Sequence, residues 1–221
     1  TFRLTSQYPR IDRAPMRDLP EAAQSERFFR AGEFTNLYVD ACSWGVLDAL
    51  GALPGPAPRN TVDMAAAAGV KPERSEEFLW LLRKLAHSGI VVLDGAGGVR
   101  SGAVAAGDPG ILRAAVLAED PAMASDFDII DAAAEGWPAF LRGERDGNQV
   151  LFTPKTLALW ERHFSNDNPL YAAANLIAAC AAGRAALGDD LQVLEAGGGL
   201  GSGAEALAAA LGADGSGGRG R

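Results

Sequence analysis

Residues 191–211 read Leu-Gln-Val-Leu-Glu-Ala-Gly-Gly-Gly-Leu-Gly-Ser-Gly-Ala-Glu-Ala-Leu-Ala-Ala-Ala-Leu, and the expected architecture follows from them. The apolar start, Leu191 with Val193 and Leu194, is typical of a short buried strand in an α/β core. Residues 204–211 predict a helix that Gly212 ends. A strand, a glycine turn and a helix in this order bring backbone N–H groups close to a nucleotide-like ligand.

Three classes of ligand site use such a turn. A phosphate-binding P-loop needs Lys followed by Ser or Thr after the last glycine, and this stretch has neither. A dinucleotide site needs G-x-G-x-x-G/A, which Gly199-x-Gly201-x-x-Ala204 satisfies while leaving Gly197 and Gly198 unexplained. The third pattern has two apolar residues, an acidic residue and then alternating glycines, and residues 193–201 fit it throughout.

This third pattern resembles the first motif of the class I S-adenosylmethionine-dependent methyltransferases. The resemblance implies that the turn approaches the methionine part of S-adenosyl-L-methionine, with the acidic residue beneath it. The cofactor-binding residues that it implies here are Glu195, Ala196, Gly197, Gly198, Gly199 and Gly201. An Ala/Gly-rich turn without a ligand, in an alanine-rich chain, and an NAD(P)-binding oxidoreductase both stay open as alternatives.

Composition limits the remaining possibilities. The 221 residues carry a formal net charge of −8, which argues against nucleic-acid binding because affinity for phosphate backbones rests on Lys and Arg. The two cysteines, Cys42 and Cys180, are expected to be free buried thiols in a reducing compartment. No apolar run approaches a membrane span and no signal sequence is visible, so a cytoplasmic location is predicted.

The N-terminal third predicts an arm followed by helices and a hairpin. Residues 1–31 contain few apolar positions and three prolines, which favours an arm. Helices are then expected at about 34–50, at 61–68 with Thr61 as the cap, and at about 73–87, followed by a β-hairpin at 90–100. This is a winged-helix order, but a DNA reader would carry a basic recognition helix. The order also resembles the N-terminal domain of plant and bacterial O-methyltransferases, which supports dimerisation or closure over substrate.

Further helices are expected after residue 108. Asp126, Asp128 and Asp131 could suggest a metal site, but their spacing along an amphipathic pattern favours a solvated acidic face, and no metal is predicted. Residues 137–141 resemble a buried corner. His87 and His163 are interpreted as surface or packing residues rather than as a base or a ligand.

Residues 153–183 predict two helices joined by a polar turn. Thr153-Pro154 is typical of a helix start, and residues 165–169 break the helix before a new one begins at Leu170. In class I methyltransferases the helix before the first strand lies along the cofactor edge of the sheet. By that resemblance Tyr171 and Asn175, with Ser165 and Asn168, would face the cofactor; alternatively Ser and Asn merely serve the turn.

Residues 157–171 followed by the glycine motif resemble the methyltransferase, or methyltransferase-derived adaptor, region at the start of polyketide synthase loading modules. In that family the methyl acceptor is a malonyl-type group on an acyl carrier protein, some members use a mononuclear iron, and others keep only an inactive adaptor. The resemblance therefore implies an acyl carrier protein or a small-molecule methyl acceptor as partner, and a homodimer or an adjoining synthase domain.

The predicted fold is mostly α with a small winged-helix hairpin, followed by the first strand, turn and helix of a truncated Rossmann-like α/β methyltransferase fold. The expected parts are an arm at 1–31, a winged-helix-like support domain at 32–108, a helical connector at 109–189 and the start of the cofactor domain at 190–221. A lone parallel strand has no ladder partner, so the chain is expected to end inside its domain and to be inactive alone. No catalytic residue is predicted.

Overall fold

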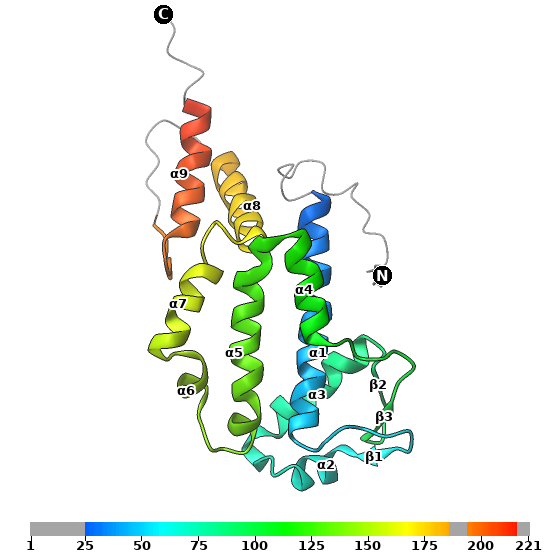
Figure 1. Ribbon diagram of the computed structural model, residues 1–221. Helices are drawn as coiled ribbons and strands as arrows, with labels where there is room; N and C mark the ends of the chain where they lie inside the picture. Colours follow the sequence, from blue (N-terminus) through cyan, green and yellow to red (C-terminus); the bar gives the residue numbers. More distant parts are fainter. Residues whose placement is uncertain (1–24, 186–193, 216–221) are drawn as a thin grey trace, which may run out of the picture. The chain divides into compact units, whose positions relative to one another are not determined.

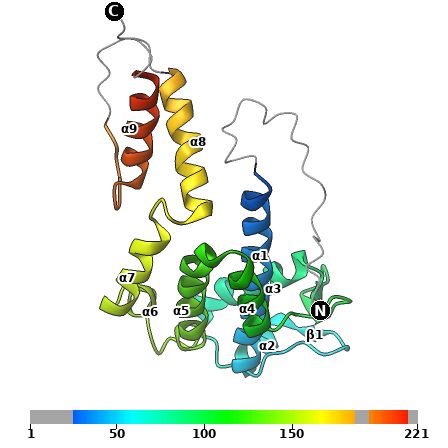
Figure 2. The same cartoon turned by 45° about the horizontal axis from the view of Figure 1, so that its top comes forward.

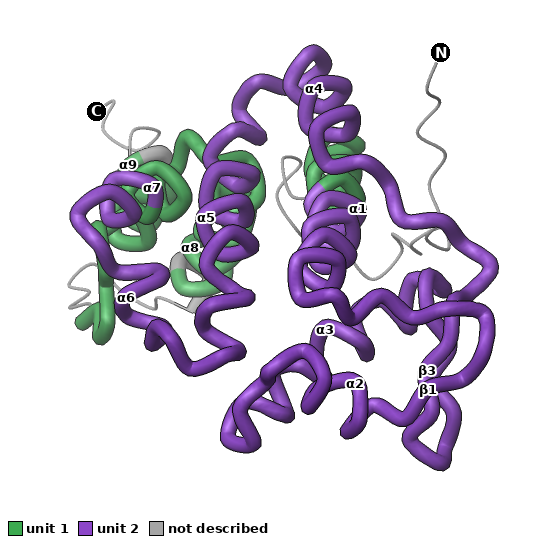
Figure 3. The backbone as a smooth tube through the Cα atoms, turned by 60° about the horizontal axis from the view of Figure 1, so that its bottom comes forward, with its two compact units in different colours: residues 1–34, 160–221 green, residues 35–159 purple. Residues whose placement is uncertain are grey.

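The computed structural model describes residues 25–185 and 194–215. Its residues group into two compact units, one formed by residues 1–34 and 160–221 and the other by residues 35–159 (Figure 3). We call them unit 1 and unit 2. The described residues are mostly helical, as predicted, and they include one small antiparallel sheet in unit 2 (Figure 1). The predicted four-part domain division stays a prediction.

Unit 2 begins within α1 (Glu26–Ala49) and continues through a helix-and-hairpin module. The module contains β1 (Arg59–Asn60), α2 (Thr61–Ala67), the 3-10 turn η3 (Pro72–Arg74), α3 (Ser75–His87), β2 (Val91–Leu93) and β3 (Gly98–Ser101). The strands lie in the order β1-β3-β2, with Val91 opposite Ser101 and Arg59 opposite Val99. The hairpin was predicted; β1 was not, because two exposed polar residues give no strand signal.

The main core of unit 2 packs one side of α3 against α1 and the sheet. The four positions of α3 that the helical period assigns to the core are all buried, namely Phe78, Leu81, Leu82 and Leu85. Most of the other members come from α1, α2 and the sheet, or from residues next to these elements, and include Val46, Leu47, Leu50, Met64, Val91 and Val99; Leu141 comes from the end of α5 (Ala124–Leu141). Each fully buried apolar side chain of this size contributes roughly 1.5–3 kcal/mol, so this cluster is the main source of stability for the module.

The second half of unit 2 covers the rest of α1. It consists of α4 (Pro109–Glu119), the 3-10 turn η4 (Pro121–Met123), α5 (Ala124–Leu141) and α6 (Gly147–Leu151). The ring of buried Tyr38 lies 4.3 Å from the ring of Phe127 on α5. The broad apolar face of α1 is therefore buried within this chain, and it gives no support to the predicted dimer, which stays a prediction.

Several element ends differ from the sequence predictions. α1 begins at Glu26 rather than at residue 34, because the hydroxyl of Ser25 accepts the N–H of Phe28 and acts as the cap. α2 is capped by Asn60 rather than by Thr61, with Asn60 Oδ1 accepting the N–H groups of Val62 and Asp63. Residues 137–141 are the last turns of α5, not a corner, with Pro138 inside the helix.

The C-terminal helices are α7 (Pro154–His163), α8 (Pro169–Ala185) and α9 (Ser202–Gly215). The hydroxyl of Thr153 accepts the N–H of Thr156, which confirms the predicted helix start. α8 and α9 lie side by side within unit 1 (Figure 2). α9 continues past Gly212, where a helical end was predicted, because this glycine lacks the left-handed conformation that ends helices. Most of the predicted strand, including Leu191 and Val193, lies outside the described residues; Leu194 is 93% exposed and in no strand.

Candidate functional site

The glycine turn before α9 has a backbone that only glycine adopts readily. Gly197, Gly199 and Gly201 have φ angles of 76°, 54° and 81°, which lie in the left-handed region. The turn closes with hydrogen bonds from the N–H of Gly201 to the carbonyl of Gly198 (2.7 Å) and from the N–H of Glu205 to the carbonyl of Gly201 (2.9 Å). A β-carbon at Gly197 or Gly201 would meet no atom within 4 Å, so these positions need glycine for conformation rather than for space.

The carboxylate of Glu195 folds back over this turn. A β-carbon built on Gly198 would lie 2.8 Å from Glu195 Oε2, and one built on Gly203 would lie 2.7 Å from Oε1. Gly203 is the second residue of α9, so the carboxylate lies at the N-terminal end of a 14-residue helix. A helix N-terminus carries a partial positive charge, which favours a carboxylate at this point. Gly198 and Gly203 therefore leave the space that Glu195 occupies.

Asn166, in the turn between α7 and α8, ties the glycine turn to α8. Its Nδ2 donates to the carbonyl of Ser202 (2.9 Å) and to Glu205 Oε2 (2.8 Å), and its Oδ1 accepts from Asn175 Nδ2 (2.9 Å). The hydroxyl of Ser202 donates in turn to the carbonyl of Phe164 at 2.6 Å. The amide side chain of Asn166 thus connects the turn between α7 and α8 to the start of α9 and to the interior of α8.

Asn175 lies beside the Glu195 carboxylate. Its Oδ1 would be 3.9 Å from a β-carbon on Gly203, the same point that Glu195 Oε1 approaches. The structure thus brings together Glu195, Gly198 and Asn175, which were predicted as cofactor-binding, with Gly203 of the same motif. Ala196 lies exposed at the start of the turn. Their role in binding stays a prediction.

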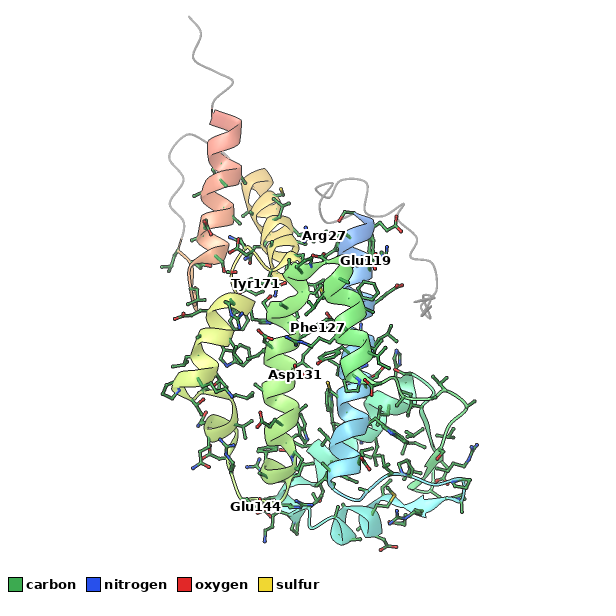
Figure 4. All side chains as sticks on the ribbon, viewed as in Figure 1. Arg27, Glu119, Phe127, Asp131, Glu144 and Tyr171 are labelled. Carbon is green, nitrogen blue, oxygen red and sulfur yellow. The ribbon has the colours of Figure 1, made fainter. Side chains whose placement is uncertain are left out.

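Tyr171 belongs to an aromatic cluster rather than to this polar group. Its ring centroid lies 5.1 Å from that of Phe164 and 6.4 Å from that of His163, and Trp160 stacks on Phe164. Figure 4 shows Tyr171 on α8 where that helix follows α7. His163 is thus a packing residue, as interpreted from the sequence.

Asn168 and Ser165 serve the turn. Asn168 is buried, its Oδ1 accepts the N–H groups of Leu170 and Tyr171, and its Nδ2 donates to the carbonyl of His163. Ser165 donates to the carbonyl of Arg162 and accepts the N–H of Asp167. Sequence reasoning missed Asn166, because nothing in Ser165-Asn166-Asp167-Asn168 separates the residue that reaches α9 from those that cap α8.

A second polar cluster lies in unit 2, and it corrects the prediction of a solvated acidic face. Arg113 on α4 donates to Asp128 (2.5 Å) and Asp131 (2.9 Å), and the hydroxyl of Tyr38 donates to Asp131 (2.5 Å). Asp126 is only 2% exposed. Asp131 and Phe127 both project from α5 toward α1 and α4 (Figure 4). Asp128 and Asp131 therefore connect helices through Arg113 and Tyr38, although the Asp131 side chain is still 45% exposed, and Asp126 is buried.

Burial and charge in this cluster shift two pKa values. Burial, followed by the hydrogen bond to Asp131, raises the pKa of Tyr38 well above its ordinary value. Burial, followed by the charge of Asp131, raises the pKa of Cys42 to about 11. Both groups therefore stay protonated near neutral pH. Cys42 is a buried free thiol, as predicted, whereas Cys180 is half-buried.

Within residues 25–185 and 194–215, no group of three or more His, Cys, Asp or Glu side chains could hold a metal ion. In the same part of the chain, no helix is both long and apolar enough to cross a membrane.

The sequence matches no protein-family model and, at a significant level, no curated protein. The fold does match solved structures. The CurJ carbon methyltransferase matches with a TM-score of 0.63 and 22% identity, over 86% of this chain and 50% of that one. The DszA carbon methyltransferase matches with a TM-score of 0.62 and 20% identity, over 94% and 56%.

The carbon methyltransferase (CMeT) domain of the citrinin polyketide synthase matches with a TM-score of 0.63 and 15% identity, over 89% of this chain and 58% of that one. The chain spans about half the length of these structures. It therefore shares its fold, over that half, with carbon methyltransferases that include a polyketide synthase domain.

Proposed function

We propose that this chain is the N-terminal part of an S-adenosylmethionine-dependent carbon methyltransferase that acts on an acyl group during polyketide assembly, at chain initiation. The shared fold with carbon methyltransferases and the glycine turn before α9 support the proposal. The observation that carries it is the position of the Glu195 carboxylate between Gly198 and Gly203.

The charge at the start of α9 favours a cationic ligand over a pyrophosphate. A dinucleotide fold places the pyrophosphate at a helix N-terminus, where backbone N–H groups and the helix dipole attract negative charge. Here Glu195 lies against the first turn of α9, and Glu205 is in the same turn. Two carboxylates there would repel a pyrophosphate. They would attract the positive sulfonium and ammonium groups of S-adenosylmethionine.

The residues present fit the methionine part of the cofactor. When bound, S-adenosylmethionine would supply an electrophilic methyl group on a sulfonium centre. Gly197, Gly199 and Gly201 keep the backbone of the turn free of side chains, so a ligand can approach its peptide groups. The carboxylate of Glu195 would provide a negative charge that offsets the positive charge of the sulfonium and ammonium groups. The contribution of these residues to catalysis would be positioning, which can supply several kcal/mol of barrier reduction.

The module from α1 to β3 would be a winged-helix-like support domain. Its helix, helix, helix and hairpin order, in a chain of net charge −8, suits dimerisation or closure over substrate better than DNA binding. The acceptor would be a malonyl-type group carried by an acyl carrier protein.

The test uses the protein encoded by the whole reading frame that contains this chain. Calorimetry should show binding of S-adenosylmethionine, and labelled methyl should pass to malonyl-carrier protein. Glu195→Gln should weaken binding roughly tenfold or more through the lost charge, since each 1.4 kcal/mol is a factor of ten. Glu144→Gln, which removes an exposed carboxylate of unit 2, is the matched control and should bind normally.

Other outcomes would select the alternatives. Cofactor binding without any methyl transfer to an acyl acceptor would favour an inactive adaptor derived from a methyltransferase. Binding of NAD(P) without binding of S-adenosylmethionine would refute the proposal in favour of an oxidoreductase.

A further inference from the structure

Asn166 has hydrogen bonds that leave its side-chain amide only one orientation. An amide NH₂ group only donates and an amide oxygen only accepts. Two acceptors, the carbonyl of Ser202 and the carboxylate of Glu205, lie 2.9 and 2.8 Å from Nδ2. Turning the amide over would place its oxygen against both of these oxygens, so Oδ1 must face α8.

The orientation of Asn166 fixes that of Asn175. Oδ1 of Asn166 can only accept, so Asn175 must present its Nδ2 to it, and the two atoms lie 2.9 Å apart. With its Nδ2 turned toward Asn166, Asn175 presents its Oδ1 to the glycine turn, 3.9 Å from a β-carbon built on Gly203. The charge of Glu205 therefore determines, through Asn166, which atom Asn175 presents beside the glycine turn.

The result is a pair of acceptors at one point. Glu195 Oε1 and Asn175 Oδ1 both approach the β-carbon position of Gly203, at 2.7 and 3.9 Å. Two oxygen acceptors, one of them charged, suit a ligand group that donates hydrogen bonds and carries positive charge. An ammonium group meets both conditions, and S-adenosylmethionine has one at its methionine end.

We propose that Asn166 is a positioning residue that orients Asn175, so that the Asn175 oxygen and the Glu195 carboxylate together receive the ammonium group of the cofactor. This inference rests on the proposed function. Asn166 itself need not contact the cofactor, because it acts through Asn175.

The experiment compares two ligands on the protein from the whole reading frame. S-adenosylmethionine carries the ammonium group, whereas 5′-methylthioadenosine has the same adenosine and sulfur without the amino-acid part. Asn166→Ala should weaken calorimetric binding of S-adenosylmethionine about tenfold, the effect of losing one charge-assisted hydrogen bond. Binding of 5′-methylthioadenosine should change by less than about twofold, because no group of this ligand reaches the acceptor pair.

A double variant tests the orientation itself. Asn166→Asp combined with Glu205→Gln reverses donor and acceptor across that hydrogen bond while leaving an acceptor for Asn175 Nδ2, but it also places an oxygen against the Ser202 carbonyl. The double variant should therefore bind S-adenosylmethionine more tightly than Asn166→Asp alone, without reaching the affinity of the unsubstituted protein. Asn166→Ala combined with Glu205→Gln should restore none of the lost affinity. Asn60→Ala, which removes an asparagine cap of α2 in unit 2, controls for general loss of stability and should leave both affinities unchanged.

Each result decides a different question. Absence of S-adenosylmethionine binding to the unsubstituted protein would overturn the proposed function. With that binding present, equal losses for both ligands in Asn166→Ala, or no loss for either, would overturn the positioning role alone. If the Asn166→Asp and Glu205→Gln pair binds S-adenosylmethionine no more tightly than Asn166→Asp alone, the orientation by Glu205 is overturned.

Discussion

At the scale of single residues, the space beside Gly203 is already filled by the Glu195 carboxylate. Gly203→Ala would place a β-carbon 2.7 Å from Glu195 Oε1, so the carboxylate must move. We expect affinity for S-adenosylmethionine to fall about tenfold, measured by calorimetry. Gly212→Ala is the matched control in the same helix. Its β-carbon meets nothing within 4 Å, and we expect a stability gain of about 0.5–1 kcal/mol with unchanged affinity.

Equal affinity in the two glycine variants would contradict a role for the Glu195 position. Thermal unfolding of both variants distinguishes a binding defect from a folding defect. Gly203→Ala should keep most of its stability, because alanine is the better helix former and only one side chain is displaced.

Cys42 gives a residue-scale prediction on pH. Its pKa rises from an ordinary 9.0 to about 11, so the folded protein keeps the thiol proton at pH values where the unfolded chain loses it. Stability from this group is fully present below pH 9 and is lost as pH rises through 9 toward 11. The full effect is roughly 2–3 kcal/mol. Urea unfolding between pH 8 and 10 should show the fall.

Cys42→Ala should remove that fall in stability, whereas Cys180→Ala should keep it because Cys42 is still present. Measurement stays below pH 10, since above it Tyr38 adds a loss of the same sign through its raised pKa. A pH slope that persists in Cys42→Ala would show that another group is responsible.

At the scale of elements, Asp131 connects three helices of unit 2. It accepts from Tyr38 of α1 and from Arg113 of α4, and it lies on α5 itself. Asp131→Ala leaves the buried Tyr38 hydroxyl without this acceptor and should lower the free energy of unfolding by about 1–3 kcal/mol. Asp128→Ala removes only one of the two Arg113 pairs and should lower it by about 1 kcal/mol or less.

A double-mutant cycle checks the mechanism. Adding Tyr38→Phe to Asp131→Ala should cost much less than Tyr38→Phe alone, because the partner of the hydroxyl is already lost. Additive losses would show that the hydrogen bond contributes little and that the helices are held by packing, such as that of Tyr38 on Phe127.

At the scale of the whole molecule, the two units should respond differently to the cofactor. The predicted cofactor-binding residues all belong to unit 1, and unit 2 comprises residues 35–159. They are Tyr171, Asn175, Glu195, Ala196, Gly197, Gly198, Gly199 and Gly201. Ligand binding stabilises the elements that it contacts. Hydrogen exchange with S-adenosylmethionine present should therefore slow at residues 195–205 and in α8. The α3 and β3 amides should exchange as before. Equal protection in both units would contradict a site confined to unit 1.

Structural features that depend on residues close together in the chain could be predicted from the sequence. The helical period placed Phe78, Leu81, Leu82 and Leu85 in the core, and the hairpin followed from two apolar runs around a glycine turn. The glycines at 197, 199 and 201 were expected in a turn, and each has the left-handed backbone that requires glycine. These features depend on neighbours only a few residues away, so the local sequence determined them.

Tertiary structure alone decided the partners of the polar side chains. Asp128 and Asp131 have the spacing of a solvated helix face, yet Arg113 lies against them. Asn166 looks like any turn asparagine, yet it reaches Ser202 and Glu205, which lie 36 and 39 residues away. The sequence around a polar residue looks the same whether its side chain forms hydrogen bonds with water or with a distant segment of the chain. The packing of the helices selects the hydrogen-bond partner, because a buried polar group without a partner costs free energy.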